Sequence, residues 1–448
     1  MTAAPTSSTF PPTEPMPVIN GRAPWSESLS SLRVPNFRLF TISNILAMSG
    51  TWMQRIAQDW LVLQLSHSVA AVGITVAMQF APMLLFGLYG GLIVDRYSKR
   101  MLLMLTQGTV GLLAVLLAVL ALTGTIQVWH VYAIAFVVGL VTVVDNPTRQ
   151  VFVNELVGPR NLRNAISVNS SVFQLGGLIG PAVAGILLDA VGAGWAFAIN
   201  AATCVVTVLT LAALKKSKLV RSPAVPRAKG QLQQGLRYVV RKPAILWSIV
   251  MVAILSVFAL TMPVILAAYA NDIYMVGASG YGLFNTLVAG GALAGAILST
   301  RRTGVRLRTV VLMGGLWGAL QAVAAFMPSE ISFGVLLVAL GVANLLFITA
   351  ANSLVQMSSN IGIRGRVMSL YVLVLLGGQA IGGPIMGWVV SSYGPHVGIA
   401  ISGIVPAIAA VFIGIHLARR HQLRIHVSVE GRTPRVTIVR RIDGGFTA

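Results

Sequence analysis

Long apolar runs alternate with short polar connections along most of the chain. Each run reaches the roughly 20 residues that a helix needs to cross the hydrocarbon core of a bilayer. The pattern therefore predicts an all-α membrane protein with twelve transmembrane helices. The runs cover 39–63, 69–94, 101–123, 128–149, 164–188, 193–214, 244–269, 279–300, 307–327, 331–355, 366–391 and 396–418.

The basic residues divide the connections into two classes. Of the 32 Lys and Arg residues, only Arg55 lies away from the ends of the predicted spans. The others lie before the first span, in every second connection and after the last span, whereas 64–68, 124–127 and 270–278 contain none. The positive-inside rule then places both termini in the cytoplasm. We expect a multi-pass protein of the cell membrane.

A polar connection separates the spans into two sets of six. The expected units are an N-terminal six-helix bundle at 38–214, a basic cytosolic linker at 215–243 and a C-terminal six-helix bundle at 244–418. Residues 1–37 are rich in Pro, Ser and Thr, which is typical of a disordered cytosolic tail. The basic tail 419–448 alternates apolar and polar residues around a turn, which predicts a β-hairpin. This tail is either solvated at the lipid surface or a partner-binding element.

Composition and charge mainly exclude classes of protein and of partner. Apolar residues make up 56% of the chain and charged residues 10%, and the mean hydropathy is +0.82, which excludes a soluble core. The net charge of +21 is spread over short loops, so we expect anionic lipid heads and not nucleic acid as its partner.

The sequence offers no site for a cofactor. The single cysteine, Cys204, has no partner for a disulfide or a metal cluster. No GxxxxGK[ST] run or HExxH pair occurs, and no soluble stretch is long enough for a catalytic domain. We therefore expect no enzyme, no metal and no cofactor, with an ion gradient as the energy source.

The two halves of the chain repeat each other. The fifth span begins near Arg163 and reaches Gly-Pro at 180–181, and the eleventh begins near Arg366 and reaches Gly-Pro at 383–384 after the same interval. Two pseudo-symmetric six-helix bundles related about an axis along the membrane normal are typical of transporters that rock around a central site.

At this point the chain resembles the major facilitator superfamily. GLIVDRYSKR at 91–100 is similar to that superfamily's GxLxDRxGRK loop, and GGLIGPAVAG at 176–185 is similar to the GxxxGPxxGG signature of its antiporters. The segments at 50–65 and 146–157 resemble the enterobactin-exporter-like and macrolide-efflux-like branch. The resemblance implies a monomeric secondary transporter. It would export a small amphipathic molecule, a drug or a secreted metabolite such as a siderophore, in exchange for protons by alternating access.

The resemblance also implies roles for two groups of residues. The first group is an inner gate of opposite charges that holds the outward-open state, in which Asp145 can pair with Arg149 or with Lys99. The alternative is that these charges only anchor helix ends at the lipid heads. The inner gate comprises Gly91, Asp95, Arg96, Lys99, Arg100, Asp145 and Arg149.

The second group is the antiporter motif in the fifth span, where small residues bring helix backbones close together and a Gly-Pro pair adds a bend. Static helix packing is the alternative interpretation of these small residues. The motif comprises Gly176, Gly180, Pro181 and Gly185.

Arg55 and Asp59 are ionisable residues inside an apolar span, where a charge is costly and rarely kept without a function. They are four residues apart and share one helix face. Two interpretations stay open: Asp59 takes up and releases a proton as its surroundings alternate, or the two side chains form a permanent ion pair. Burial favours the neutral acid and a nearby Arg favours the carboxylate, so proton exchange requires the pair to break during the cycle.

Polar side chains at mid-span depth are the candidates for a substrate cavity, although Asn and Gln also serve as packing contacts between helices. Because the charges of Arg55 and Asp59 cancel, a neutral or amphipathic substrate is favoured. A proton-coupled importer on the same fold and a non-transporting membrane sensor or scaffold are the rival functions. The candidate cavity residues are Asn44, Thr51, Gln54, Gln58, Gln79, Asn169, Gln174, Asn285, Asn344, Asn352 and Gln379.

Overall fold

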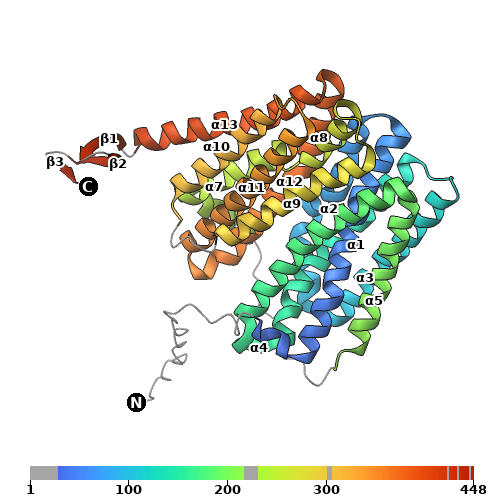
Figure 1. The fold of residues 1–448 in the computed structure, drawn as a ribbon. Coiled ribbons are helices and arrows are strands. Elements are labelled where there is room, and N and C mark those ends of the chain that lie inside the picture. The colour runs from blue at the N-terminus through green and yellow to red at the C-terminus, as the bar shows by residue number, and fades with distance from the viewer. Residues whose placement is uncertain are drawn as a thin grey trace, which may run out of the picture.

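The computed structural model is built almost entirely from helices (Figure 1). It describes residues 29–215, 231–299, 305–420, 423–430, 433–442 and 445–447. The elements of the first half are η2 (Ser30–Arg33), α1 (Pro35–Ser66), α2 (Val69–Arg96), α3 (Lys99–Leu122), α4 (Val128–Ala190) and α5 (Ala193–Ala213). Those of the second half are α6 (Gln231–Arg241), α7 (Pro243–Phe258), α8 (Met262–Ala268), η4 (Tyr269–Ile273), α9 (Gly277–Ser299), α10 (Leu307–Ala324), α11 (Glu330–Ser358), α12 (Ile361–Tyr393) and α13 (Pro395–Arg420).

Local sequence signals mark where several helices begin and end. Pro35 and Pro243 occupy the first turns of α1 and α7, where a missing N–H is tolerated. The Ser98 hydroxyl accepts a hydrogen bond from the Met101 N–H at the start of α3, 3.2 Å away. Gly394 follows α12 with φ 88°, a conformation that suits glycine.

Eleven segments of the described helices are long and apolar enough to cross a membrane. They include two spans within α4 and one that runs from α7 through η4. The polar residues of α1 lower its hydropathy, so α1 is not among the eleven, but this 32-residue helix packs against α4 and α5 inside the first bundle (Figure 1). α1 therefore has the length and the place in the first bundle that a further span requires. The all-α, two-bundle fold agrees with the prediction.

The predicted break between the fourth and fifth spans is much shorter in the structure. Residues 150–163 were expected to form a polar junction, but α4 continues through them and is interrupted only at Gly158. Gly158 has φ 67° and ψ −179°, a conformation that is strained for residues with a Cβ. The chain thus changes direction from one span to the next at Gly158.

The two bundles meet along two helix crossings, α2 with α12 and α4 with α9. Glycines lie at both crossings, so the backbones approach closely. A Cβ built on Gly73 of α2 would lie 2.3 Å from the Gly383 carbonyl oxygen of α12, and one built on Gly282 of α9 would lie 2.5 Å from the Gly185 Cα of α4. These contacts are possible only because the side chains are absent.

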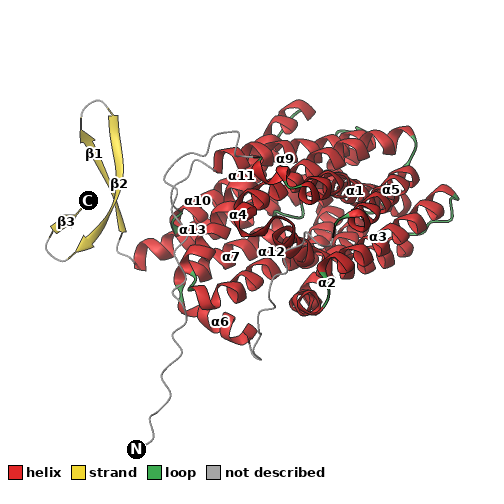
Figure 2. Cartoon of the chain, turned by 90° about the horizontal axis from the view of Figure 1, so that it is seen from below, coloured by secondary structure: helices red, strands yellow, loops and turns green. Residues whose placement is uncertain are grey.

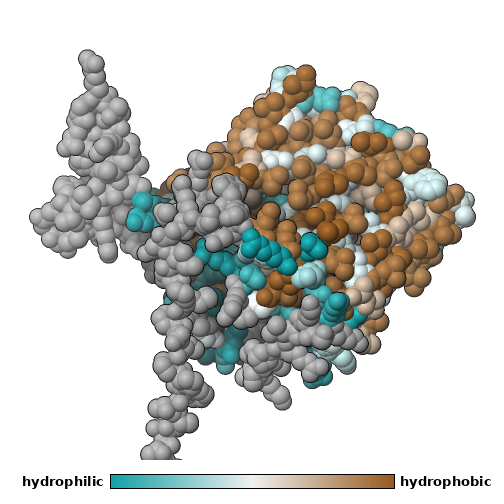
Figure 3. Space-filling view, turned by 60° about the horizontal axis from the view of Figure 1, so that its bottom comes forward, coloured by the Kyte–Doolittle hydropathy of each residue, from teal (hydrophilic) through white to brown (hydrophobic). Residues whose placement is uncertain are grey.

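Lys and Arg residues mark one end of the molecule, which we call the basic end. It carries η2, the turn between α2 and α3, and the helix α6. Figure 3 shows hydrophilic residues gathered toward this side, with apolar residues covering the flanks of the bundles. The opposite, far end carries the turns at 67–68, 123–127 and 191–192, which contain no Lys or Arg. The glycines at 73, 185 and 282 lie near the far end of their helices, so the two bundles touch closely near this end.

The predicted bounds of the N-terminal tail and the linker differ from the bounds of the helices in the structure. Residue 37 was expected to end a disordered tail, but α1 already begins at Pro35, and the Ser31 hydroxyl of η2 donates a hydrogen bond to the Asn164 side chain 2.5 Å away. Residues 1–28 and 216–230, in the predicted tail and linker, lie outside the described residues. The rest of the linker forms α6, which contacts α12.

The predicted hairpin in the C-terminal tail is present. β1 (Leu423–Glu430) pairs antiparallel with β2 (Thr433–Ile442), with Glu430 opposite Thr433, and β3 (Gly445–Thr447) extends the sheet. Figure 2 shows these strands beyond the end of α13.

Candidate functional site

Asp59 is buried at the point where the two bundles meet. Asp59 lies on α1 and is only 3% exposed. The Gln79 amide of α2 donates a hydrogen bond to one carboxylate oxygen at 3.3 Å, and the Tyr281 hydroxyl of α9 donates to the other at 3.4 Å. Asp59 therefore contacts a neighbour in its own bundle and one in the second bundle.

Arg55 lies one turn from Asp59 on the same helix but turns toward aromatic rings. Its guanidinium carbon is 5.4 Å from the centroid of the Trp52 ring and 5.2 Å from that of Phe80. Among the residues that the structure describes, Arg55 and Asp59 do not come close enough to form an ion pair. The cation–π contacts allow Arg55 to stay partly buried without a carboxylate in direct contact.

A small cavity of about 20 Å³ lies inside the first bundle beside Arg55, large enough for a water molecule. Thr51, Gln54, Gln58 and Gln79 line it, so four of the predicted cavity residues come together here. Gln54 accepts a hydrogen bond from the Asn200 amide of α5 at 2.6 Å. Thr51, Gln54 and Gln58 thus face the interior of one bundle, whereas Gln79 also reaches Asp59 at the boundary between the two.

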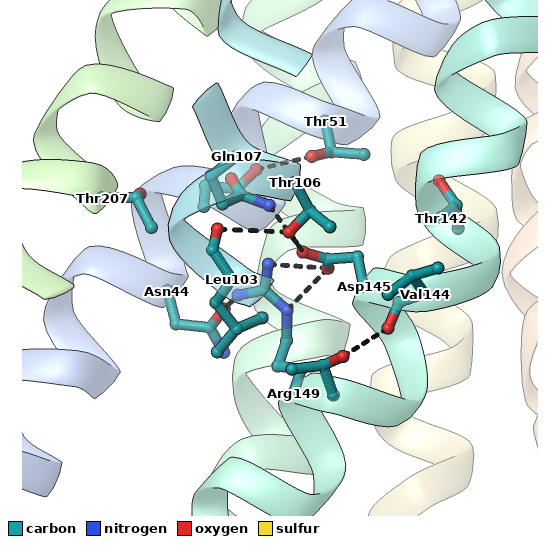
Figure 4. Close-up of polar contacts among 12 residues, drawn as sticks. Asn44, Thr51, Leu103, Thr106, Gln107, Thr142, Val144, Asp145, Arg149 and Thr207 are labelled. Carbon is teal, nitrogen blue, oxygen red and sulfur yellow. Dashed lines mark hydrogen bonds and ion pairs between the residues drawn. The ribbon is translucent and has the colours of Figure 1, made fainter. Parts of the chain in front are cut away.

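Asp145 and Arg149 form a buried ion pair inside the first bundle (Figure 4). Of the two partners that the sequence offered to Asp145, the structure selects Arg149, with an N–O distance of 2.9 Å. Thr106 and Gln107 of α3 donate to the other Asp145 oxygen at 2.7 and 3.1 Å. Arg149 also donates a hydrogen bond to Asn44 of α1. The pair therefore ties α1, α3 and α4 together.

The charged turn between α2 and α3 lies at the basic end. Arg100 donates hydrogen bonds from its guanidinium to the carbonyl oxygens of Leu211 and Ala212, at 2.6 and 2.5 Å. These carbonyls belong to the last turn of α5, where a cation also interacts favourably with the helix dipole. Asp95 and Lys99 are partly buried, and Arg96 is exposed. In this conformation Arg100 thus fastens α3 to α5.

The antiporter motif on α4 faces both bundles. A Cβ built on Gly176 would lie 2.6 Å from the Met48 Cβ, and one on Gly180 would lie 2.6 Å from the Trp52 Cβ, so these two glycines seat α1. Pro181 and Gly185 approach Gly282 of α9 in the second bundle. The motif therefore joins the packing of the first bundle to the contact between bundles.

The remaining candidate cavity residues are dispersed. Asn44 accepts from Arg149 and donates to Asn169 at 3.1 Å, so both belong to the buried network around Asp145. Asn285 donates to the backbone carbonyl oxygen of Tyr281 at 2.9 Å. The others are partly buried on α4, α11 and α12: Gln174, Asn344, Asn352 and Gln379.

Sequence analysis did not predict three residues that contact the buried carboxylates. Tyr281 lies in a small-residue stretch, GASGYGLFN, whose pattern gives no sign of a carboxylate partner. Thr106 and Gln107 reach Asp145 only through the packing of α3 on α4. The spacing of four between Gly383 and Gly387 was a usable signal for the α12 crossing.

Comparison with known proteins identifies the family. The model of a family described as transmembrane secretion effector matches residues 26–437. The chain belongs to the transmembrane secretion effector family. Among curated relatives of this family member, the enterobactin exporter EntS of Salmonella typhi is 25% identical over 401 residues, which cover 88% of this chain and 95% of that protein. EntS of Escherichia coli O6:K15:H31 is 24% identical over 416 residues, covering 91% and 99%.

Solved structures support the fold. A bacterial homologue of the lysosomal transporter Spinster, in an inward-facing and occupied conformation, has a TM-score of 0.68 at 16% identity and covers 87% of this chain and 97% of its own. A POT family transporter in complex with a thioalcohol-conjugated peptide has a TM-score of 0.70 at 11% identity, covering 86% and 96%. The family match and the curated relatives together support a major facilitator transporter of the enterobactin-exporter-like branch, and the solved structures agree in fold.

Proposed function

We propose that the protein exports a small amphipathic molecule of the siderophore class across the cell membrane in exchange for protons. The relatives named above are exporters of enterobactin, which supports both the direction and the substrate class. In this proposal the basic end faces the cytoplasm and anionic lipid heads, and the proton gradient is the only energy source for a monomeric carrier.

The environment of Asp59 is the main observation that supports proton exchange. This buried carboxyl group lies inside the membrane, receives hydrogen bonds from Gln79 and Tyr281, and has no ion-pair contact with Arg55 among the described residues. A group held by neutral donors can exist as a carboxylate or as an acid with a smaller rearrangement than one locked to a cation. Asp59 is therefore the proposed site of proton binding and release.

The close helix crossings near the far end support alternating access. In this proposal the crossings close the far end, and the described conformation is the one in which the carrier takes up substrate from the basic end. Rocking of one bundle against the other would separate Gly73 from Gly383 and Gly185 from Gly282. Asp59, close to this boundary, would then be exposed to the opposite side.

Transport in inverted membrane vesicles tests the proposal. Vesicles with an acidic interior and a labelled siderophore, with enterobactin as the first compound, should accumulate the compound against its gradient when they contain the wild-type protein. Asp59→Asn should abolish this uphill accumulation while downhill exchange of the compound continues. Asp272→Asn, which changes an exposed carboxylate, is the matched control and should behave as wild type. Unchanged uphill accumulation by Asp59→Asn would remove Asp59 as the coupling site, and accumulation driven in the opposite direction would favour an importer.

A further inference from the structure

Tyr281 brings the second bundle into contact with Asp59. It is 0% exposed, and its ring stacks on Trp60 of α1 with centroids 5.6 Å apart and an interplanar angle of 23°. Its hydroxyl donates to the Asp59 carboxylate at 3.4 Å. One tyrosine thus makes both an aromatic and a polar contact with the helix that carries the proposed proton site.

The helix that carries Tyr281 also forms the far-end seal. Gly282, the next residue, lies against Pro181 and Gly185 of α4. The Ser279 N–H donates to the Asp189 carboxylate of α4 at 3.0 Å, so α9 and α4 are joined on both sides of Tyr281. Opening of the far end separates these helices and must also withdraw the Tyr281 hydroxyl from Asp59.

The other groups around Asp59 do not change partners between bundles. Arg55 lies on the same helix as Asp59, and Gln79 comes from α2 of the same bundle. Among the described residues packed against Asp59, the charged or titratable groups that interact with it are Arg55 and Tyr281. Tyr281 is therefore the group whose contact with Asp59 depends on the position of the second bundle.

We propose that Tyr281 is a positioning residue that links the ionisation of Asp59 to closure of the far end. This inference rests on the proposed proton exchange at Asp59. A carboxylate accepts a stronger hydrogen bond than the neutral acid does. Ionised Asp59 therefore stabilises the closed far end more than protonated Asp59 does.

This link supplies a rule that antiport requires. An empty carrier with ionised Asp59 stays closed at the far end until substrate binds, because opening would cost the Tyr281 contact. A carrier with protonated Asp59 loses only a weaker hydrogen bond when the far end opens. It therefore exchanges between its two conformations. The empty ionised carrier therefore does not open the far end and return with a proton, so protons do not leak inward without export of substrate.

Distance measurements between two spin labels at the far end test the link. In a Cys204→Ala background, Leu65→Cys at the end of α1 and Tyr393→Cys at the end of α12 place exposed labels on different bundles. Wild type should shift from closed toward open as the pH falls. Tyr281→Phe keeps the ring but removes the hydroxyl, so the closed-to-open ratio at high pH should fall about tenfold, with little change at low pH, because hydrogen bonds to charged groups contribute roughly 1.5–3 kcal/mol and this one is long. An unchanged pH response of Tyr281→Phe overturns the inference.

Three comparison variants distinguish failure of this link from failure of the proposed function. Tyr371→Phe removes another buried hydroxyl, which donates to the Ile348 carbonyl oxygen at 3.3 Å, and should keep the wild-type pH response. In Asp59→Asn the ratio should no longer depend on pH, and adding Tyr281→Phe should change it little. If Asp59→Asn retains uphill transport and its pH response, the proposed function fails at its coupling site. If Asp59→Asn loses both but Tyr281→Phe responds as wild type, only the link through Tyr281 fails.

Discussion

Replacing Gly282 with Ala should hold the far end of the transporter partly open. The added Cβ would lie 2.5 Å from the Gly185 Cα and 2.6 Å from the Pro181 carbonyl oxygen. Both neighbours are backbone atoms, so no flexible side chain can move aside. The two helices must therefore separate by roughly 1 Å to reach ordinary van der Waals distance.

The size of the effect follows from where the strain acts. Overpacking of a close contact costs about 1–3 kcal/mol. This cost falls on the closed far end alone, because the contact is lost when the bundles separate. The equilibrium should therefore shift toward the open far end by about 5- to 150-fold. The fold within each bundle should be retained, since Gly282 contacts α4 across the boundary and not a helix of its own bundle.

The labelled pair at Leu65 and Tyr393 measures the shift directly. Gly290→Ala is the matched control on the same helix, because its Cβ would meet only the Leu178 Cδ1 at 3.7 Å, an ordinary contact. Gly290→Ala should give the wild-type distance distribution, and Gly282→Ala should enrich the longer distances. Equal distributions in the two variants, with equal thermal stability, would refute the idea that backbone contact at this crossing sets the closed state.

Three further predictions concern stability and the tail. Arg149→Leu should lower the unfolding free energy by about 3–5 kcal/mol because Asp145 stays buried without its cation, and Asp145→Asn combined with Arg149→Leu should recover much of this loss in denaturant titrations of the purified protein. Gly158→Ala should cost about 1–3 kcal/mol in the same assay, whereas Gly108→Ala, whose Cβ meets nothing within 4 Å, should cost far less. Truncation after Arg420 should leave vesicle transport unchanged, and loss of transport on truncation would favour a function for the β-sheet tail.

The spans follow from the sequence because membrane insertion is governed by length and hydropathy, which are local properties. Even Asp145 and Arg149 are predictable as a pair, since four residues within a helix place them on one face. The prediction fails where a contact depends on how helices rotate against each other. Thr51, Gln54 and Gln58 have the polarity of substrate ligands, but packing turns them toward a small cavity inside one bundle.

Asp59 illustrates both sides of this limit. Its burial is predictable, because a carboxyl group in an apolar span must face protein or water and not lipid. Its partner Tyr281 is 222 residues away in the sequence and belongs to the other bundle. Local periodicity carries no information on such a pair, and only the crossing of α9 with α4 brings the two side chains together.

The distribution of charge makes this pair decisive for coupling. Arg55, Asp59, Asp145 and Arg149 all lie in the first bundle, whereas the apolar spans of the second bundle contain no Lys, Arg, Asp or Glu away from their ends. A protonation event on α1 can therefore reach the second bundle only through neutral polar groups or through packing. Tyr281 supplies the polar contact, and the neighbouring Gly282 supplies the packing contact, one residue apart on α9. Movement of α9 must alter both together, which is why the state of Asp59 and the closure of the far end are expected to change as a unit.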